Sequence, residues 1–276
     1  MRLLITGHQG FIGTHLFKKI KQDHSDIELI GIDKKSGFDI TDYEKLMTLQ
    51  HIDLIVHLAA TCSSAKSITD TKSDFTDNVI GSFNICECAR KHKAGIVYVS
   101  SCKVQPNEKG SRAPYGLSKY VGELYIEEYS KDFGIEYVIN RFGTVYGPGQ
   151  DVSPESGWLT WFIQASKSGK KITINGDGKQ SRDVLFIDNC VRLLEDQIVN
   201  FDLYKGEVYD VGGGPENEVT LLQVLGHLDY DNYDFGPERI GDVKHFVSDN
   251  KKITSVNGWK PKIGWKKGIE ITKINN

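Results

Sequence analysis

Residues 2–13 read RLLITGHQGFIG. The short apolar run at 2–6 predicts a strand, glycines follow it at once, and residues 11–20 have the spacing of a helix. Gly7 would let the chain turn sharply, Gly10 would let the backbone approach a diphosphate, and Gly13 would let the helix pack closely on the strand. A purely structural glycine turn is the alternative. Strand, glycines and helix in this order predict a dinucleotide-binding site, with the helix N-terminus facing the phosphates.

The next apolar run, residues 27–32, is followed by Asp33, 20 positions after Gly13. A carboxylate at the end of this strand can accept hydrogen bonds from the hydroxyls of an adenosine ribose, and it would repel a 2′-phosphate. NAD is therefore favoured over NADP as the cofactor. Lys34 and Lys35 come next and work against that preference, and an unrelated surface aspartate is the alternative interpretation.

Short apolar runs alternate with longer helical segments through the first half of the chain. Strands separated by helices imply a parallel sheet that is covered on both faces. We therefore predict an α/β protein with a Rossmann-type doubly wound parallel sheet. Further strands are expected at 54–58, 96–99 and 137–140, and the helices include 11–20 and 75–90.

The alternation of short apolar strands and helices ends at about Gly147. From there on, glycines, prolines and tryptophans interrupt the pattern. In sheets of this type, ligands bind beyond the carboxyl ends of the strands, and we expect the irregular segments of the second half to lie there. We expect residues 1–146 to form mainly the NAD-binding Rossmann domain. Residues 147–276 are expected to form mainly a smaller C-terminal substrate-binding lobe, with segments that return to the sheet.

Composition narrows the class of protein. The 276 residues carry a formal net charge of −3, with 26% charged and 39% hydrophobic residues. No basic excess points to a nucleic-acid partner, and no apolar run is long enough to cross a membrane. The five cysteines have no zinc spacing, so no metal site is expected. Reduced thiols and a start unlike a signal peptide predict a cytoplasmic protein.

Several segments in a fixed order resemble a known family. The chain is similar to the extended short-chain dehydrogenase/reductase family, in its nucleotide-sugar epimerase/dehydratase branch. The resemblance runs through nearly the whole chain and implies the Rossmann fold, an NAD(P) cofactor, a nucleotide diphospho-sugar ligand and a place in carbohydrate biosynthesis. The matching segments are TGHQGFIG at 6–13, FDIT at 38–41, VHLAA at 56–60, NVIGSFN at 78–84, VSS at 99–101, YGLSK at 115–119, RFGTVYGPG at 141–149, GDGKQSRDVLFIDN at 176–189 and ERIGD at 238–242.

The same resemblance implies a set of cofactor contacts. Asp39 and Ile40 would lie near the adenine, residues 58–60 would line the cofactor site, and Asn78 would help to hold its loops. The full expected set is Gly7, Gln9, Gly10, Phe11, Ile12, Gly13, Asp33, Asp39, Ile40, Leu58, Ala59, Ala60, Asn78, Ser100, Tyr115 and Lys119.

Tyr115 and Lys119 are four positions apart, so on a helix they share one face. A tyrosine with its ordinary pKa of about 10 is a poor base at neutral pH, but a neighbouring ammonium would lower that pKa. Lys119 would do this while holding the nicotinamide ribose, and Ser101 would hydrogen-bond the same substrate oxygen. These residues could remove the proton of a sugar hydroxyl while a hydride leaves for NAD. Tyr115 follows Ser101 by only 14 positions, a shorter loop than is usual in the family, which would open the site or admit a larger sugar.

The two residues after Ser101 bear on the reaction type. Sugar 4,6-dehydratases of this branch have Asp-Glu there, whereas this chain has Cys102 and Lys103. A lysine at the second position resembles CDP-tyvelose 2-epimerases and close relatives, as does GWLTWFIQ at 157–164. Lys103 would contact a sugar hydroxyl or a phosphate, or act as an acid, unless it is a solvated lysine. Cys102 is a candidate acid or base beside a ketone, with an inert packed thiol as the alternative.

The second half holds candidate contacts to the nucleotide sugar. Arg182 and Arg239 lie where the family grips the diphosphate, and guanidinium groups suit bidentate recognition of phosphate, with surface arginine as the alternative. Thr144 stands where many relatives have an asparagine that contacts the sugar or phosphate, which argues against an ordinary UDP-galactose 4-epimerase. Trp158 and Trp161 would share a helix face and either pack the lobe or shape the substrate pocket.

We therefore predict an NAD-dependent nucleotide-sugar epimerase that works through a transient keto sugar and resembles CDP-tyvelose 2-epimerase. The alternatives are a nucleotide-sugar 4-epimerase, a 4,6-dehydratase or an NADP-dependent keto-sugar reductase on the same scaffold, and a non-catalytic NAD-binding regulatory module. The resemblance also implies a homodimer. Helices at 75–90 and 115–131 would pair with their copies into a four-helix bundle, with Ile85, Leu124 and Ile126 as outward apolar positions unless they are core.

Overall fold

The structure is a computed structural model, and it describes residues 1–107, 109–153, 157–238 and 243–275. The chain divides into two compact units. Unit 1 comprises Met1–Arg141 and Val191–Tyr209, and unit 2 comprises Phe142–Cys190 and Asp210–Asn276.

Unit 1 is built on a six-stranded sheet. Its strands are β1 Arg2–Thr6, β2 Glu28–Ile32, β3 Leu54–His57, β4 Gly95–Ser101, β5 Tyr137–Phe142 and β9 Glu207–Val211, where β5 and β9 each run on into unit 2. The strand order is β2-β1-β3-β4-β5-β9, and β1 pairs in parallel with both β2 and β3. β3 pairs in parallel with β4. The order turns back at β1, as in doubly wound sheets, so the predicted fold class is confirmed.

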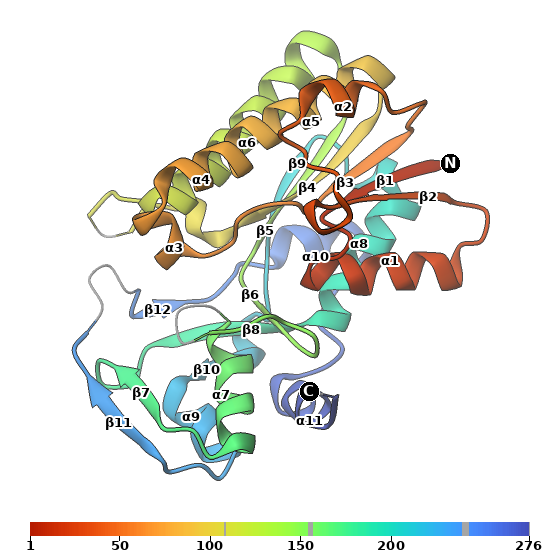
Figure 1. The fold of residues 1–276 in the computed structure, drawn as a ribbon. Helices are drawn as coiled ribbons and strands as arrows, with labels where there is room; N and C mark the ends of the chain where they lie inside the picture. The colour runs from red at the N-terminus through yellow and green to blue at the C-terminus, as the bar shows by residue number, and fades with distance from the viewer. Residues whose placement is uncertain (108, 154–156, 239–242, 276) are drawn as a thin grey trace. The chain divides into compact units, whose positions relative to one another are not determined.

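Helices cover both faces of this sheet. They are α1 Phe11–Asp23, α2 Tyr43–Met47, α3 Ser64–Thr69, α4 Thr71–Phe75, α5 Gly81–His92, α6 Ala113–Phe133 and α8 Ile187–Val199, of which α8 begins in unit 2. Figure 1 shows α5 and α6 on one face of the sheet and α1 on the other. Strands covered in this way are buried on both sides, which is why they read as nearly continuous apolar runs.

The helix expected at 75–90 is interrupted. α4 ends at Phe75, and a turn of π-helix, η2 Thr76–Ile80, precedes α5. The N–H of Gly81 donates to the carbonyl of Thr76, five residues back, and the Ser82 hydroxyl donates to the Asn78 carbonyl at 2.6 Å. Because a π turn widens the helix locally, it is a frequent feature of functional sites, and here it carries Asn78.

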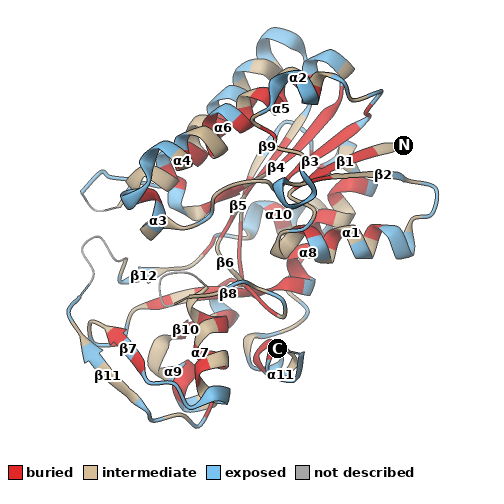
Figure 2. Cartoon of the chain, viewed as in Figure 1, coloured by how far each residue is buried: buried red, intermediate tan, exposed pale blue. Residues whose placement is uncertain are grey.

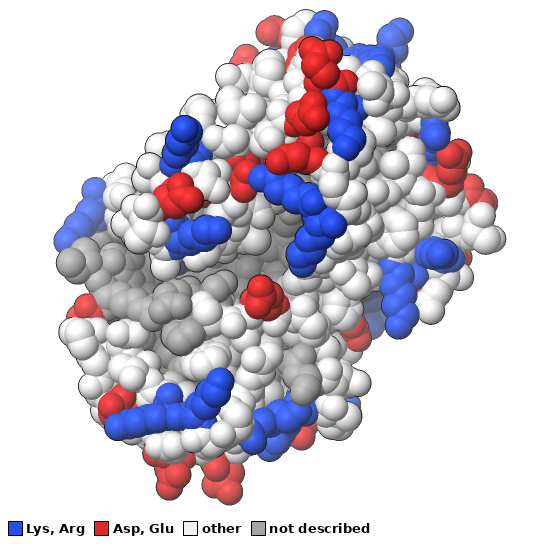
Figure 3. Space-filling model, viewed as in Figure 1, with Lys and Arg blue, Asp and Glu red and all other residues white. Residues whose placement is uncertain are grey.

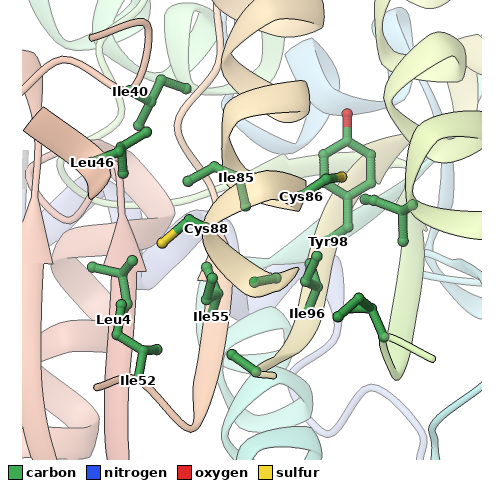
Figure 4. Close-up of a cluster of buried hydrophobic side chains, with 14 of the residues drawn as sticks. Leu4, Ile40, Leu46, Ile52, Ile55, Ile85, Cys86, Cys88, Ile96 and Tyr98 are labelled. Atoms are coloured by element: carbon green, nitrogen blue, oxygen red, sulfur yellow. The ribbon is translucent and has the colours of Figure 1, made fainter. Parts of the chain in front are cut away.

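One hydrophobic core cluster of unit 1 lies between the sheet and the helices on the α5 face. Leu4, Ile55 and Ile96 come from β1, β3 and β4, and they belong to one cluster with Ile85 of α5 and Ile126 of α6 (Figure 4). Full burial of such a side chain contributes about 1.5–3 kcal/mol each. Ile85 and Ile126 are therefore core residues, which is the alternative that the sequence left open, and they do not face outward. Figure 2 shows the same division, with buried strands and helices exposed on their outer faces.

Unit 2 contains two small sheets and four helices among its described residues. In the first sheet, β8 Ser181–Phe186 lies between β10 Glu218–Thr220 and β12 His245–Phe246 and also pairs with β6 Thr144–Tyr146. In the second, β7 Ile172–Asn175 pairs with β11 Tyr233–Gly236. The helices are α7 Trp158–Ser168, α9 Leu221–His227, α10 Lys251–Asn257 and α11 Trp265–Asn275. The Tyr146 hydroxyl donates to the Trp265 carbonyl at 2.9 Å, which joins β6 to α11.

None of the helices within the described ranges is both long enough and apolar enough to span a bilayer. On the face drawn in Figure 3, acidic and basic side chains are interspersed.

Candidate active site

The glycine-rich turn between β1 and α1 has no room for side chains. Gly7 has a φ of +70°, and a Cβ built there would come within 2.8 Å of the Ala59 nitrogen. A Cβ on Gly13 would overlap the Gly7 carbonyl. The Gly7 N–H donates to the Ile32 carbonyl at 2.8 Å, which ties the turn to the end of β2. Gly10 caps α1 without a side chain, so the first N–H groups of the helix are left for an anionic ligand.

Asp33 stands beside this turn at the end of β2. One carboxylate oxygen accepts the N–H of Gln9 at 3.1 Å, and the other accepts the N–H of Lys35 at 2.8 Å. These bonds fix the carboxylate next to the glycine-rich turn, where a ribose hydroxyl of a dinucleotide would be recognised. Together, the turn and Asp33 fit NAD.

Asp39 and Ile40 follow in the next loop. Asp39 accepts the N–H of Thr41 at 2.9 Å. Burial works to raise the pKa of Asp39, but this hydrogen bond and the charge of Lys34 outweigh it, so the pKa is lowered. Ile40 is buried, and its carbonyl accepts a hydrogen bond from the Asn84 side chain at 2.9 Å.

The segment after β3 is held from two sides. The Thr6 hydroxyl accepts the N–H groups of Leu58 and Ala59 at 3.2 and 3.1 Å. Asn78 accepts the N–H of Thr61 at 2.9 Å and donates to the Thr61 carbonyl at 3.0 Å. Asn78 therefore holds this loop at Thr61.

Tyr115, Ser101 and Lys119 are brought together by β4 and α6. A Cβ on Gly116 would overlap the Lys103 carbonyl, so this glycine lets the start of α6 approach the 3-10 turn η3 Cys102–Val104. The Ser101 side chain is hydrogen-bonded to Tyr115. Lys119 lies one turn further along α6, and its ammonium sits 4.1 Å from the centre of the Tyr98 ring.

Burial shifts the pKa values of Tyr115 and Lys119 so that the charged form of each side chain is disfavoured. It raises the pKa of Tyr115, with a further rise from the Cys62 thiol, and the hydrogen bond with Ser101 opposes this. Burial also lowers the pKa of Lys119 to about 8, against the influence of Cys62 and Glu123. The predicted lowering of the Tyr115 pKa is wrong in this structure, because the cost of burying a phenolate outweighs the hydrogen bond that favours it.

Glu123 is a residue that the sequence analysis missed. Its carboxylate is 1% exposed, accepts the Ser100 hydroxyl at 2.5 Å and pairs with the Arg141 guanidinium at 2.6 Å. Tyr115, Lys119 and Glu123 are spaced four apart on α6, so continuing the same spacing would have found it. The partners that make the site complete, Ser100 and Arg141, come from β4 and β5.

Ser67, Asp74 and Ser118 were also missed. The Ser67 hydroxyl accepts the N–H of Tyr115 at 3.1 Å. Asn78 donates to Asp74 and to the Ser118 hydroxyl, both at 3.0 Å. Nothing in their spacing marks them, because α3, α4 and α6 bring them to the site only in three dimensions.

Cys102 and Lys103 lie in η3, directly after Ser101. Cys102 is half-buried and Lys103 is exposed. The Lys103 N–H donates to the Ser101 hydroxyl at 3.2 Å, so Ser101 caps this turn. The Cys102 thiol contributes to the raised pKa of Tyr115, which places it near the phenol.

In unit 2, two of the predicted sugar-binding residues lie on paired strands. Thr144 begins β6, which pairs with β8, and Arg182 is the second residue of β8. The Arg182 guanidinium donates to the Ser181 carbonyl at 2.6 Å. Arg239 lies outside the described residues. Trp158 packs edge-on against Phe162 with ring centres 5.5 Å apart, which supports a packing role for this tryptophan.

Comparison with known proteins identifies the family. Residues 3–212 match the model of the NAD dependent epimerase/dehydratase family. The chain belongs to this family. The membership confirms the resemblance found in the sequence, and with it an NAD-dependent enzyme.

Relatives in this family align over almost the whole chain. CDP-paratose 2-epimerase of Salmonella typhi is 30% identical over 98% of this chain and 97% of its own. A putative UDP-glucose 4-epimerase of Methanocaldococcus jannaschii is 32% identical over 97% of this chain and 96% of its own. Among solved structures, UDP-glucuronic acid 4-epimerase of Bacillus cereus, in complex with UDP-glucuronic acid and NAD, has a TM-score of 0.88 at 27% identity and covers 100% of this chain and 98% of its own.

Proposed function

We propose that this chain epimerises a nucleotide-linked sugar through a transient keto sugar, with Ser101, Tyr115 and Lys119 as the catalytic residues. The observation that carries the proposal is the meeting of these three at the end of β4: Ser101 is hydrogen-bonded to Tyr115, and Lys119 lies one helical turn beyond. Relatives named as nucleotide-sugar epimerases support the substrate class.

Each of the three residues has a distinct part in moving the proton. Tyr115 Oη takes the proton of the sugar hydroxyl as the carbon of that hydroxyl gives up its hydride and a C=O bond forms. Bound NAD supplies the hydride acceptor and, in its reduced form, the donor. Ser101 holds the same oxygen, and the Lys119 ammonium stabilises the phenolate that burial disfavours.

The two units divide the binding of the ligands. Unit 1 would hold NAD through the glycine-rich turn, Asp33 and the loop after β3. Unit 2 would hold the nucleotide sugar through Arg182 and Arg239, which would grip the diphosphate, and through Thr144. The placement of Thr144 and Arg182 on paired strands supports a common site in unit 2.

The carbon that changes configuration depends on the residues after Ser101. We favour a 2-epimerase, because Lys103 stands where CDP-tyvelose 2-epimerase-like enzymes have a lysine and because CDP-paratose 2-epimerase aligns over the whole length. If the ketone forms at a carbon next to the one that inverts, Cys102 is the candidate group that would exchange the proton of the inverting carbon. A 4-epimerase is the second candidate, because a putative UDP-glucose 4-epimerase also aligns over almost the whole chain.

We also propose a homodimer through α5 and α6. Leu117 is 53% exposed and Leu124 is 41% exposed, and their spacing of seven puts them on one face of α6. Tyr125 beside them is exposed as well. An apolar face of this kind is typical of a helix that packs against a partner.

We place the protein in the cytoplasm, in the biosynthesis of carbohydrates. Its five cysteines are free thiols, which are usual in that reducing compartment. A nucleotide-activated sugar is the substrate class that such biosynthesis consumes.

The proposal is tested by incubating the protein with CDP-, UDP-, dTDP- and GDP-sugars in deuterated water and following each sugar by NMR. We expect one stereocentre to invert without net change of cofactor. The stereocentre that inverts distinguishes a 2-epimerase from a 4-epimerase. Deuterium at the inverted carbon would support proton exchange beside the ketone with Cys102 or Lys103 as the proton donor, whereas inversion without deuterium would support a ketone that takes the hydride back on its other face. Net consumption of reduced cofactor, loss of water from the sugar, or no reaction with any sugar would contradict epimerisation.

A further inference from the structure

Lys34 lies at the position where a dinucleotide-binding site of this kind discriminates between NAD and NADP. It follows Asp33 at the end of β2 and opens the 3-10 turn η1 Lys34–Ser36. A cation in this position could receive the 2′-phosphate that distinguishes NADP from NAD. The sequence alone therefore leaves Asp33 and Lys34 with opposite preferences.

In the structure the Lys34 ammonium is bound by two carboxylates. It lies 2.6 Å from Asp77 and 3.3 Å from Asp39. Burial works to lower the pKa of Lys34, but the pairing with Asp77 and Asp39 outweighs it, and the pKa is raised. The ammonium is thus charged and already paired.

Both carboxylates are held by other parts of unit 1. Asp39 accepts the N–H of Thr41 at 2.9 Å. Asp77, in the π turn η2, accepts the Thr61 hydroxyl at 2.7 Å. These contacts fix the positions of the two carboxylates. Lys34 would therefore have to break both ion pairs before its ammonium could bind a phosphate.

The neighbouring cation does not replace Lys34. The Lys35 ammonium donates to the Gln9 carbonyl at 3.4 Å, and the backbone N–H of Lys35 donates to the Asp33 carboxylate. The Lys34 ammonium pairs with Asp39 and Asp77, and Asp33 directly precedes Lys34 in the chain. A 2′-phosphate would meet an excess of negative charge here.

We propose that Asp39 and Asp77 are cofactor-selectivity residues, which exclude NADP by holding Lys34 in an ion pair. This rests on the NAD site of the proposed function, and it adds a second barrier to the repulsion by Asp33. Asp77 pairs directly with Lys34, so the effect of this ion pair on the choice of cofactor must disappear when Lys34 is removed.

The test is the ratio of the dissociation constants for NADP+ and NAD+, measured by calorimetric titration of protein freed of copurified nucleotide. Asp77→Asn should lower this ratio about tenfold, the worth of one charge-assisted contact to phosphate. Asp77→Asn combined with Lys34→Met should restore the parent ratio. The matched control is Asp42→Asn, which removes the same charge from the cap of α2, where Asp42 accepts the N–H of Lys45 rather than binding Lys34.

Two results would overturn the proposal: a ratio for Asp77→Asn equal to that of Asp42→Asn, or a lowered ratio that persists after Lys34→Met. If Asp77→Asn does not fold, Asp39→Asn, which removes the longer of the two ion pairs at 3.3 Å, should lower the same ratio by a smaller factor. The parent could bind NAD+ while Asp77→Asn shows the same NADP+/NAD+ ratio as Asp42→Asn. That result would refute the selectivity role and leave the NAD site of the proposed function standing. A parent that binds neither dinucleotide refutes the cofactor site itself, and this proposal with it.

Discussion

The Lys119 ammonium lies 4.1 Å from the centre of the Tyr98 ring, and only 3% of Lys119 is exposed. A ring face offers a cation partial compensation for lost hydration. The compensation is incomplete, since burial lowers the pKa of Lys119 to about 8. The site therefore keeps a charged group at a cost to the stability of the fold.

Lys119→Met should make the protein more stable and less active. Because the Lys119 pKa falls from 10.5 to about 8 on folding, the penalty for burying the charge is fully present below pH 8 and disappears as the pH rises to 10.5. At pH 7 we expect the free energy of unfolding of the variant to exceed that of the parent by about 1–3 kcal/mol. Urea unfolding at several pH values measures the difference.

The matched control for this prediction is Lys131→Met on the same helix. Lys131 pairs with Glu128 at 2.6 Å on the surface, and the Lys131 side chain is 66% exposed. Its removal should change the stability by less than about 0.5 kcal/mol at any pH. A Lys119→Met variant that is less stable than the parent at pH 7 would show that the ammonium is not buried at a cost.

Tyr115→Phe should lower kcat by about 10²–10⁴-fold, the range for loss of a positioned acid or base. The fold should persist, because the backbone N–H of residue 115 keeps its bond to Ser67. NAD released from the purified variant by acid and quantified by chromatography should match the parent. Tyr125→Phe, which removes a hydroxyl from an exposed position of α6, is the control and should retain full activity. Turnover by Tyr115→Phe at the parent rate would refute Tyr115 as the base.

The Rossmann half could be predicted because its requirements are local. The turn at Gly7 needs a positive φ, and the spacing of Tyr115 and Lys119 follows from one helical turn. Asp33 could be placed because it ends a short apolar strand. Each of these features depends on residues that are neighbours in the chain.

What could not be predicted depends on contacts between distant segments. Glu123 has its place because Ser100 and Arg141 reach it from 23 and 18 positions away. The π turn before Gly81 replaces part of an expected regular helix. The raised pKa of Tyr115 reflects burial by several elements, and helix spacing carries no information about that burial.

Leu124→Asp should convert a homodimer into a monomer. Leu124 is 41% exposed on α6, and a carboxylate there would be desolvated in the paired helices of two copies. Light scattering after size-exclusion chromatography measures the mass. Leu203→Asp adds the same charge at a residue that is 61% exposed in another segment of unit 1, and it should leave the dimer intact. A parent that is itself monomeric, or a Leu124→Asp variant that stays dimeric, would contradict the proposed interface.

Glu123→Gln should move the alkaline limit of activity to lower pH. The Glu123 carboxylate raises the pKa of Lys119 against the larger effect of burial. Without that charge the Lys119 pKa falls below about 8, so the ammonium is lost earlier as the pH rises, and kcat/KM declines earlier with it. The variant should also lose about 1–3 kcal/mol of stability, because Arg141 loses its charged partner. Glu128→Gln, at a surface pair of the same helix, should leave the pH profile unchanged. If Glu123→Gln lowers stability alone, with the profile of kcat/KM against pH unmoved, Glu123 supports the fold without tuning Lys119.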